Sequence, residues 1–401
     1  MMNEFLRRTW AEIDLDALTE NYHAIRSQVN GKAAMCCVVK ADAYGHGAPT
    51  VARLYQQLGA EWFAVSNVEE AVQLRRSGIY RPILILGYTP PEMASILSRE
   101  NVSQSVLSLE YARALSEQAQ KAGCMVRCHM KVDTGMSRIG FFYQQQGRDE
   151  KSLEEIVTAC GLPGIEPQGI FTHFAVADEG EAGEAYTRQQ YDCFTAAIAF
   201  CEERGIHFTV RHCCNSGAIL DYPGFSLDMV RPGIIQYGLL PSGDMRHPLP
   251  LRPAMALRSV ISHKKSIAAG TTVSYGRTFR AERDMVLATV PIGYADGYPR
   301  RLSGQADVLV NGRRAPIVGR ICMDQMMIDV TGIEQVCPGQ TVTLFGEDHG
   351  SVLPVEELAE KAGTIAYETI CLIGKRVPRI YLRDGQAVTQ MNYFDSEHWI
   401  E

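Results

Sequence analysis

The chain has 401 residues, of which 46% are hydrophobic, and it carries a formal net charge of −7. This composition is typical of a globular protein, and the negative charge argues against nucleic acid or an anionic membrane surface as a partner. No apolar run approaches the ~18 residues that span a bilayer, and the opening MMNEFLRRTW lacks the apolar core of a signal peptide. We therefore expect no membrane partner and a cytoplasmic location.

Eight short β-rich runs follow one another over the first part of the chain. They are 35–40, 62–67, 82–87, 103–108, 126–132, 168–174, 209–216 and 225–233. Amphipathic helical stretches separate most of them; for example, 68–78 has acidic residues in its first turn and arginines in its last, which suits the helix dipole. Strands that alternate with helices predict an α/β fold, a parallel (β/α)8 TIM barrel over residues 10–245.

The rhythm changes after the proline-rich stretch that begins near residue 246. Alternating runs with glycine turns follow at short spacing, and an Asn-Gly pair at 311–312 is typical of a hairpin. We expect a mostly-β C-terminal domain over 246–386, joined by the N-terminal segment 1–9. The tail 387–401 shows no clear pattern and stays unassigned.

The twelve cysteines lie mostly within predicted strands and helices. In a reducing compartment such thiols act as small hydrophobic side chains. Cys124 and Cys128 come nearest to metal-ligand spacing, together with the run 212–214, but neither forms a paired CxxC motif. We expect no metal site.

Polar residues cluster where the predicted barrel strands end. The carboxyl ends of barrel strands form the active-site face of such folds. Lys40 ends the first strand and His173 the sixth, and the other ends carry Lys131, Asp133, Arg138, Ser216, Gly217 and Arg231. Lysine and arginine often cap strands, so no single residue is decisive; their convergence at one rim is the stronger signal.

Two glycine-bearing loops in this set have the features of an anion site. NSGA (215–218) and RPGIIQYG (231–238) follow the last two strands, where barrels often bind phosphate with loop amides. The chain has no GxGxxG and no GxxxxGK[ST] motif, which disfavours a Rossmann or P-loop nucleotide site. A phosphate site beside a strand-end lysine indicates pyridoxal 5'-phosphate, held by a Schiff base and by loop amides.

The sequence resembles the bacterial alanine racemases over about residues 8–385. The resemblance is carried by VVKADAYGHG (38–47), KVDTGMSRIG (131–140), FTHFAVAD (171–178), NSGA, RPGIIQYG, VSYG (273–276), PIGYADGYPR (291–300), VGRICMDQ (318–325) and AYETIC (366–371). These motifs occur in the family's order. The resemblance implies a pyridoxal-phosphate enzyme that interconverts L-alanine and D-alanine by two-base proton transfer and so supplies D-alanine for peptidoglycan.

The resemblance assigns roles to individual residues. It implies that Lys40 carries the cofactor and that Tyr275 is the second catalytic base, reaching the active site of a partner subunit in a homodimer with shared sites. His173 is the neighbour expected to make Tyr275 a competent base, because free tyrosine has a pKa near 10. The cofactor contacts implied for the remaining matches are Tyr44, Ser216, Arg231, Gly233, Ile234 and Tyr367.

Arg231 matches the residue that bonds the pyridine nitrogen of the cofactor. Because arginine holds its proton to very high pH, it protonates that nitrogen poorly and favours return of a proton to the substrate over transamination. Arg138 matches a residue near the substrate carboxylate, and Lys131 a lysine that is carbamylated in many members. Met323 and Asp324 match partner-subunit residues beside the substrate. A polar entrance is matched by Asp178, Tyr294, Arg300 and Arg320.

Other classes of protein fit the sequence less well. A non-catalytic cofactor-binding barrel protein would lack the β domain and its tyrosine, and a barrel-fold decarboxylase would place an acid where Arg231 stands. A serine or broad-specificity amino-acid racemase is the closest alternative. A small apolar pocket rejects an added hydroxyl only about a hundredfold, so some serine activity is compatible with this reading.

Overall fold

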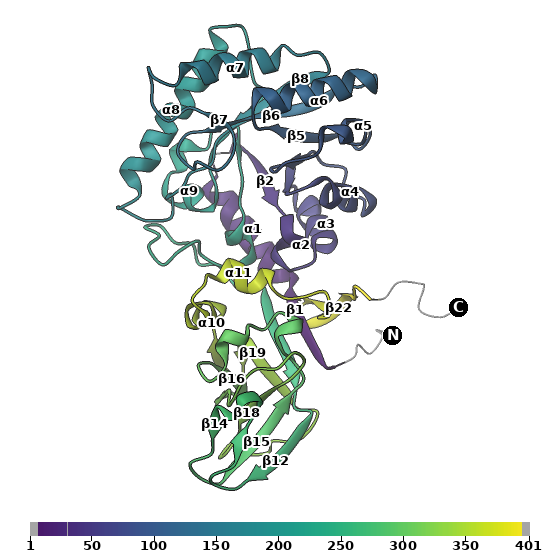
Figure 1. Ribbon diagram of the computed structural model, residues 1–401, viewed down its shortest axis with the longest axis vertical. Coiled ribbons are helices and arrows are strands. Elements are labelled where there is room, and N and C mark those ends of the chain that lie inside the picture. Colours follow the sequence, from purple (N-terminus) through teal and green to yellow (C-terminus); the bar gives the residue numbers. More distant parts are fainter. Residues whose placement is uncertain (1–6, 30, 395–401) are drawn as a thin grey trace, which may run out of the picture. The chain divides into compact units, whose positions relative to one another are not determined.

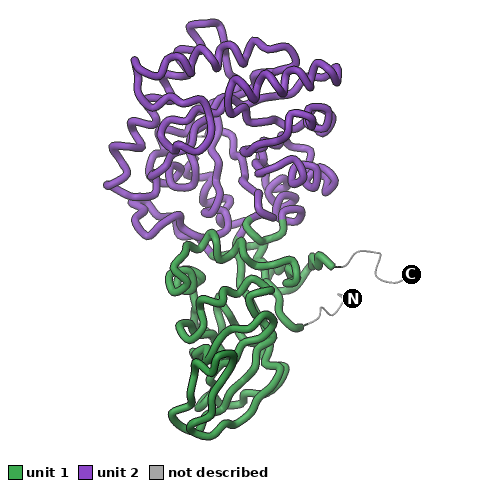
Figure 2. Tube along the Cα trace, in the orientation of Figure 1, with its two compact units in different colours: residues 1–17, 44–47, 253–401 green, residues 18–43, 48–252 purple. Residues whose placement is uncertain are grey.

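The computed structural model describes residues 7–29 and 31–394. Two compact units divide the chain (Figure 2). One unit comprises residues 18–43 and 48–252, and the other comprises 1–17, 44–47 and 253–401. We call them the barrel unit and the β unit. The short insert 44–47 therefore belongs to the β unit although both flanking segments belong to the barrel unit.

The barrel unit contains a parallel sheet in the order β10-β2-β3-β4-β5-β6-β8-β9. Its strands are β2 (Ala34–Val38), β3 (Trp62–Val65), β4 (Ile83–Ile85), β5 (Val102–Val106), β6 (Val126–Asp133), β8 (Ile165–Phe171), β9 (Val210–His212) and β10 (Met229–Val230). The backbone bond from Arg231 N to Cys214 O, 2.9 Å, links the ends of the last two strands and nearly closes the ring. The prediction of an eight-stranded parallel barrel is confirmed.

Helices cover the outside of this ring of strands (Figure 1). They are α3 (Ala48–Leu58), α4 (Val68–Arg76), α5 (Ala94–Arg99), α6 (Leu109–Lys121), α7 (Glu150–Cys160) and α8 (Glu184–Glu202), with α1 (Leu15–Gln28) before the first barrel strand. Local sequence sets their starts: the side chain of Asn67 accepts a bond from Glu70 N, and that of Ser108 accepts one from Tyr111 N. Most barrel strands consist largely of buried residues, as expected for a sheet covered by helices; β9, in which only His212 is buried, is an exception.

The β unit is built on a sheet in the order β17-β16-β19-β11-β1-β21-β22. Its strands are β1 (Thr9–Asp14), β11 (Met255–Val260), β16 (Asp307–Val310), β17 (Arg313–Pro316), β19 (Thr341–Asp348), β21 (Arg379–Arg383) and β22 (Gln386–Met391). Smaller sheets use β12 (His263–Ile267), β13 (Thr272–Val273), β14 (Phe279–Arg280), β15 (Met285–Val290), β18 (Met326–Asp329) and β20 (Ser351–Leu353). The helices α10 (Val355–Ala362) and α11 (Ala366–Cys371) complete it. A mostly-β second domain is thus confirmed.

Details of the β unit follow the sequence closely. Asn311 and Gly312 both have positive φ, 51° and 71°, as a type I′ hairpin between β16 and β17 requires. The N-terminal strand β1 pairs with β11 and β21. The unassigned tail forms β22, which pairs antiparallel with β21 as far as Met391; residues 1–6 of the N-terminal segment and 395–401 of the tail lie outside the described residues.

No helix of the described residues is both long enough and apolar enough to cross a membrane. Within the same residues, no group of three or more histidines, cysteines and acids is placed to hold a metal ion.

Candidate active site

Lys40 begins a turn with unusual backbone geometry, one residue beyond the end of β2. In α2 (Lys40–Tyr44), residues 41–44 all have φ between 52° and 55°, which is the left-handed region. Left-handed geometry costs an L-residue about 1–2 kcal/mol, so the turn must be held by its surroundings. Glu70 accepts a bond from Ala41 N at 2.7 Å, and Asp42 accepts one from Ala48 N at 2.8 Å. The strain and its anchors fix the direction in which the half-buried Lys40 leaves the strand.

Arg231 is a buried cation that has only neutral hydrogen-bond partners. It is 3% exposed and follows β10 directly. Its guanidinium donates to His212 Nδ1 at 2.7 Å and to the carbonyls of Thr172 and Cys213 at 2.8 and 3.0 Å. Burial lowers the pKa of Arg231 from its usual value. Among the described residues it forms no ion pair, so carbonyl dipoles and imidazole lone pairs stabilise the charge.

His212, which bonds Arg231, also forms a hydrogen bond with a second histidine, His129. Arginine can only donate, so His212 Nδ1 must accept and its Nε2 carries the proton. His212 Nε2 lies 2.9 Å from His129 Nδ1, which makes His129 the acceptor of that bond. Burial, followed by the charge of Arg231, holds the pKa of His212 well below its usual value. Burial also lowers the pKa of His129 to about 4, and both rings stay neutral at neutral pH.

Sequence reasoning gave no role to His129 or His212. One signal was available: His129 and Lys131 are two residues apart in β6, so their side chains share a face of the strand. The sequence singles out His212 only as part of the run 212–214, which does not form a metal-binding motif.

Lys131 is buried in β6 beside this network. Its ammonium nitrogen donates to the Val132 carbonyl at 2.9 Å and lies 5.2 Å from the centre of the Phe171 ring. Burial, followed by the charge of Arg231, lowers the pKa of Lys131 to about 7. Asp133 accepts bonds from Gly135 N and Ser137 N at 3.0 and 2.9 Å rather than from Lys131.

His173 lies at the meeting point of the predicted cations. It is half-buried, and its Nδ1 is 3.4 Å from an amino group of Arg231. Its pKa falls well below the usual value, first through burial and then through four cations: Arg231, Lys131, Arg138 and Lys40. The barrel mouth therefore concentrates positive charge, and within the described chain neither Lys131, Arg138 nor Arg231 has an ion-pair partner. Such a mouth is suited to an anion.

The two glycine-bearing loops meet beside these cations. The backbone N–H of Gly233 donates to Ser216 Oγ at 2.9 Å, which ties the loop after β10 to the start of α9 (Ser216–Asp221). Asn215 caps α9 by accepting a bond from Ala218 N. A Cβ at Gly217 would lie 2.9 Å from the Ala177 carbonyl, so glycine is required for this close approach. Ile234, in the same loop, is fully buried.

The predicted residues of the β unit form two further groups. Tyr44 is buried and its ring centre lies 6.1 Å from that of Tyr367; burial raises the pKa of the Tyr44 phenol, so it stays protonated. Tyr275, Met323 and Asp324 line a pocket of about 650 Å³. The side chain of Tyr275 is 70% exposed there. One side of its turn is held because Ser274 Oγ donates to the Arg320 carbonyl at 2.6 Å; on the other side Gly276, with a φ of 71°, supplies a left-handed residue.

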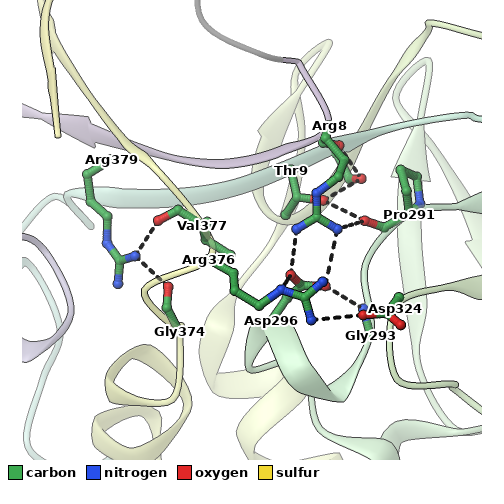
Figure 3. Close-up of polar contacts among 11 residues, drawn as sticks. Arg8, Thr9, Pro291, Gly293, Asp296, Asp324, Gly374, Arg376, Val377 and Arg379 are labelled. Carbon is green, nitrogen blue, oxygen red and sulfur yellow. Dashed lines mark hydrogen bonds and ion pairs between the residues drawn. The ribbon is translucent and has the colours of Figure 1, made fainter. Parts of the chain in front are cut away.

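Asp324 is held by a network of charges in the β unit (Figure 3). It pairs with Arg376 at 2.8 Å, and the other side of Arg376 lies 3.6 Å from Asp296. Asp296 is fully buried and pairs with Arg8 at 2.6 Å. The network thus connects the N-terminal segment to the wall of the pocket.

The predicted entrance residues come from both units, Asp178 from the barrel unit and the other three from the β unit. Tyr294 is 42% exposed, and its N–H donates to the Cys322 carbonyl at 3.1 Å. Asp178 uses its backbone carbonyl to accept a bond from Ser242. Arg300 is exposed and Arg320 is partly buried. Their role as an entrance stays a prediction.

These observations define a class. A parallel barrel whose mouth holds a strand-end lysine, a buried arginine with neutral partners and a loop cluster suited to an anion is an enzyme fold with a lysine-based active site. Comparison with known proteins makes the assignment specific. The family model described as alanine racemase, N-terminal domain, matches residues 13–241, and the one described as alanine racemase, C-terminal domain, matches 254–381.

Relatives support the same family over nearly the whole chain. An alanine racemase of Desulfovibrio desulfuricans is 46% identical, with 95% of this chain and all of the relative covered. One from Clostridium perfringens is 44% identical, with 98% of this chain and all of the relative covered. The chain belongs to the alanine racemase family.

Solved structures agree with the fold. The alanine racemase of Clostridium difficile 630 superposes with a TM-score of 0.92 at 39% identity and covers 98% of this chain and all of that one. The Bacillus anthracis enzyme, whose structure contains bound L-Ala-P, gives a TM-score of 0.91 at 38% identity and covers 98% of this chain and 99% of that one.

Proposed function

We propose that this protein is an alanine racemase that interconverts L-alanine and D-alanine with pyridoxal 5'-phosphate and supplies D-alanine for peptidoglycan. The single observation that carries the proposal is the setting of Arg231. A pyridine nitrogen facing a guanidinium with neutral partners stays unprotonated, which suits racemisation better than transamination. A carboxylate in that place would favour other pyridoxal-phosphate reactions.

The residues of the barrel mouth fit this cofactor. Lys40 would hold it covalently, and the cations around His173 would balance its phosphate and phenolate charges. Tyr44, Ser216, Gly233, Ile234 and Tyr367 would bind the phosphate. When bound, the cofactor supplies a carbonyl carbon for attachment and an electron sink for the charge left at the substrate's α-carbon.

Two bases of this chain would move the α-proton. The Lys40 amine would take or return it on one face of the substrate, and the Tyr275 phenolate on the other. Tyrosine needs help to act as a base near neutral pH. The neutral state of His173 indicates how: its Nδ1 faces Arg231, so its Nε2–H can donate a hydrogen bond to a phenolate.

We propose that Tyr275 serves a second copy of the chain in a homodimer with two shared active sites. Its phenol is 70% exposed on a rigid turn, beside Met323, which is 52% exposed. A tyrosine and a methionine presented together in this way are typical of an interface. Arg138, Met323 and Asp324 would then bind the substrate, with Arg138 from one copy and the other two from its partner.

We propose that Lys131 is carbamylated. With a pKa of about 7, a large fraction of its amine is neutral near neutral pH and can attack carbon dioxide. The reaction forms an N–C bond and releases one proton, and it turns a buried cation into an anion that the charges of Arg231 and Arg138 would stabilise. Intact mass measured in bicarbonate and in carbon-dioxide-free buffer tests this: wild type should gain the mass of one carbon dioxide, and Lys131→Ala should not.

A cytoplasmic location is the final part of the proposal. All twelve cysteines lie in the described part of the chain and all are free thiols. Free, mostly buried thiols are typical of a reducing compartment.

The proposal is tested by following optical rotation with purified protein and pyridoxal phosphate on L-alanine and on L-serine separately. Rotation should fall to zero with alanine and much more slowly with serine. Faster loss of optical rotation with L-serine than with L-alanine would instead support the alternative function, a serine racemase. Lys40→Ala should abolish turnover and the visible absorbance of lysine-bound cofactor; retained covalent cofactor would contradict the assignment of Lys40.

A further inference from the structure

Arg379, the first residue of β21, is the largest fully buried side chain in the described chain and is 1% exposed. Its guanidinium donates to carbonyl oxygens of the backbone. Two of these, Gly374 O at 2.8 Å and Ile373 O at 2.6 Å, belong to the loop before β21, and Figure 3 shows the contact with Gly374. Burying a cation is costly, so a buried arginine that bonds only carbonyls serves to fix the segments that own them.

One of those carbonyls belongs to a distant segment. Arg379 Nε donates to Gly45 O at 2.8 Å, across 334 positions of sequence. The next residue is held in the same way, because the Tyr381 hydroxyl donates to His46 O at 3.1 Å. These contacts lie within the β unit, to which residues 44–47 belong.

Steric contacts reinforce this attachment. A Cβ on Gly45 would lie 2.4 Å from the Ile370 carbonyl, and one on Gly47 would lie 1.9 Å from the Tyr381 hydroxyl. Both glycines have positive φ, 82° and 93°. A Cβ at Gly45 would displace the Ile370 backbone, and one at Gly47 would displace the Tyr381 and Met391 side chains, so the close packing of segment 44–47 against β21 and α11 requires glycine at both positions.

The seated segment begins with Tyr44. This residue ends the left-handed turn that starts at Lys40, and its φ is 53°. A strained turn relaxes unless both ends are held. Glu70 holds the beginning, through Ala41 N. Arg379 holds the residue that directly follows the end.

The C-terminal tail covers Arg379. In β22, Met391 pairs with Arg379, and the guanidinium carbon of Arg379 lies 5.1 Å from the centre of the Tyr393 ring. A cation over an aromatic face is favourable, and the ring also excludes water. The tail, which shows no clear sequence pattern, therefore helps to shield the Arg379 guanidinium from solvent.

We propose that Arg379 is a positioning residue for the cofactor site, which holds the Tyr44 hydroxyl in place through the backbone of Gly45, with Tyr393 as its cover. The proposal rests on the proposed function, because it takes Tyr44 as a ligand of the cofactor phosphate. It assigns a functional role to the C-terminal tail, which contains none of the predicted site residues.

The experiment measures two quantities on the full-length apoprotein: its melting temperature, and its Kd for pyridoxal phosphate, by visible absorbance. The variants are Arg379→Met and Arg379→Lys. The control is Arg258→Met, since Arg258 also bonds a carbonyl of the β unit, that of Glu347 at 2.7 Å, and pairs with Glu12 at 3.0 Å. It removes a comparable arginine that does not contact the 44–47 segment.

Arg379→Met should weaken cofactor binding about tenfold or more, the loss expected for one hydrogen bond from a charged donor. Arg379→Lys should restore part of the affinity, since an ammonium can still donate to one carbonyl. Arg258→Met should lower the melting temperature and leave the Kd unchanged. An Arg379→Met protein that melts earlier but binds pyridoxal phosphate as wild type does would overturn the proposal and leave a structural role only.

Two further variants keep the proposal testable if Arg379→Met does not fold. Tyr381→Phe removes the hydroxyl that bonds His46 O, and Tyr393→Leu removes the aromatic ring beside the Arg379 guanidinium. Each should weaken pyridoxal phosphate binding by about threefold, in line with a neutral hydrogen bond or an exposed cation–π contact. Unchanged Kd values in both would overturn the proposal. Wild-type protein that binds no pyridoxal phosphate would instead refute the proposed function, and this inference with it.

Discussion

Replacing Ala41 with glycine probes the left-handed turn that carries Lys40. Ala41 is exposed and has φ 52° and ψ 47°, so glycine removes its backbone strain without leaving a cavity. The matched control is Ala199→Gly, because Ala199 is an exposed alanine within the right-handed helix α8. The two substitutions are chemically identical and differ only in the backbone geometry that receives them.

The magnitudes separate the two variants clearly. At Ala41 glycine relieves about 1–2 kcal/mol of left-handed backbone strain in the folded state. It also gives the unfolded chain more conformational freedom, which destabilises the fold by about 0.4–1 kcal/mol. The net effect leaves the protein unchanged or up to about 1.5 kcal/mol more stable. At Ala199 glycine should destabilise by about 1 kcal/mol, the ordinary helix penalty. The free energies of unfolding of the two variants should therefore differ by about 1–2.5 kcal/mol.

Urea unfolding followed by circular dichroism measures both variants against wild type. We expect the Ala41→Gly midpoint at or above that of wild type and the Ala199→Gly midpoint below it, with equal slopes. If Ala41→Gly lowers the midpoint as much as Ala199→Gly does, the turn at Lys40 is not strained and the argument that its surroundings hold it fails.

Three further predictions concern the site. The pKa of Lys131 is about 7 in the folded chain against an ordinary 10.5, so between pH 7 and 10.5 the unfolded chain binds a proton that the folded chain does not, and the free energy of unfolding should rise with pH. Urea unfolding at pH 7 and 9.5 in carbon-dioxide-free buffer should show a smaller rise for Lys131→Met than for wild type. An equal rise in both proteins would refute the assignment. Arg231→Glu should divert turnovers to transamination, seen as pyruvate formed from alanine; pyruvate at the wild-type level would count against the role of the guanidinium. Tyr275→Phe should slow α-proton exchange from one enantiomer of alanine far more than from the other, and equal mild losses would argue against two bases on opposite faces.

The barrel could be predicted from the sequence because its local hydrophobic and capping patterns agree with the tertiary structure. The buried runs and the caps Asn67 and Ser108 mark strands and helix starts that the structure confirms. The positive φ values of residues 41–44 were beyond such reasoning, because alanine, aspartate and tyrosine give no local preference for four consecutive left-handed residues. That geometry depends on anchors from elsewhere in the chain, among them Glu70 at Ala41 and Arg379 at Gly45.

Other parts of the site were missed for the same reason. The pair His129 and His212 joins two strands that are 83 positions apart, so single-sequence periodicity could not connect them. The strand β22 has alternation too weak to recognise, because most of its residues are exposed and its pairing with β21 supplies the order. Sequence patterns therefore identify the candidate site residues, and tertiary contacts explain how the fold holds those residues in place.

The central claim, racemisation of alanine by two bases, is tested most directly by incubating L-alanine with the holoenzyme in deuterium oxide and analysing both enantiomers early in the reaction by chiral mass spectrometry. The account predicts that the D-alanine formed carries deuterium at its α-carbon while the remaining L-alanine keeps its proton, because the base that returns a proton is not the base that removed one. Early D-alanine that largely retains the original proton, or L-alanine that exchanges as fast as it racemises, would contradict it.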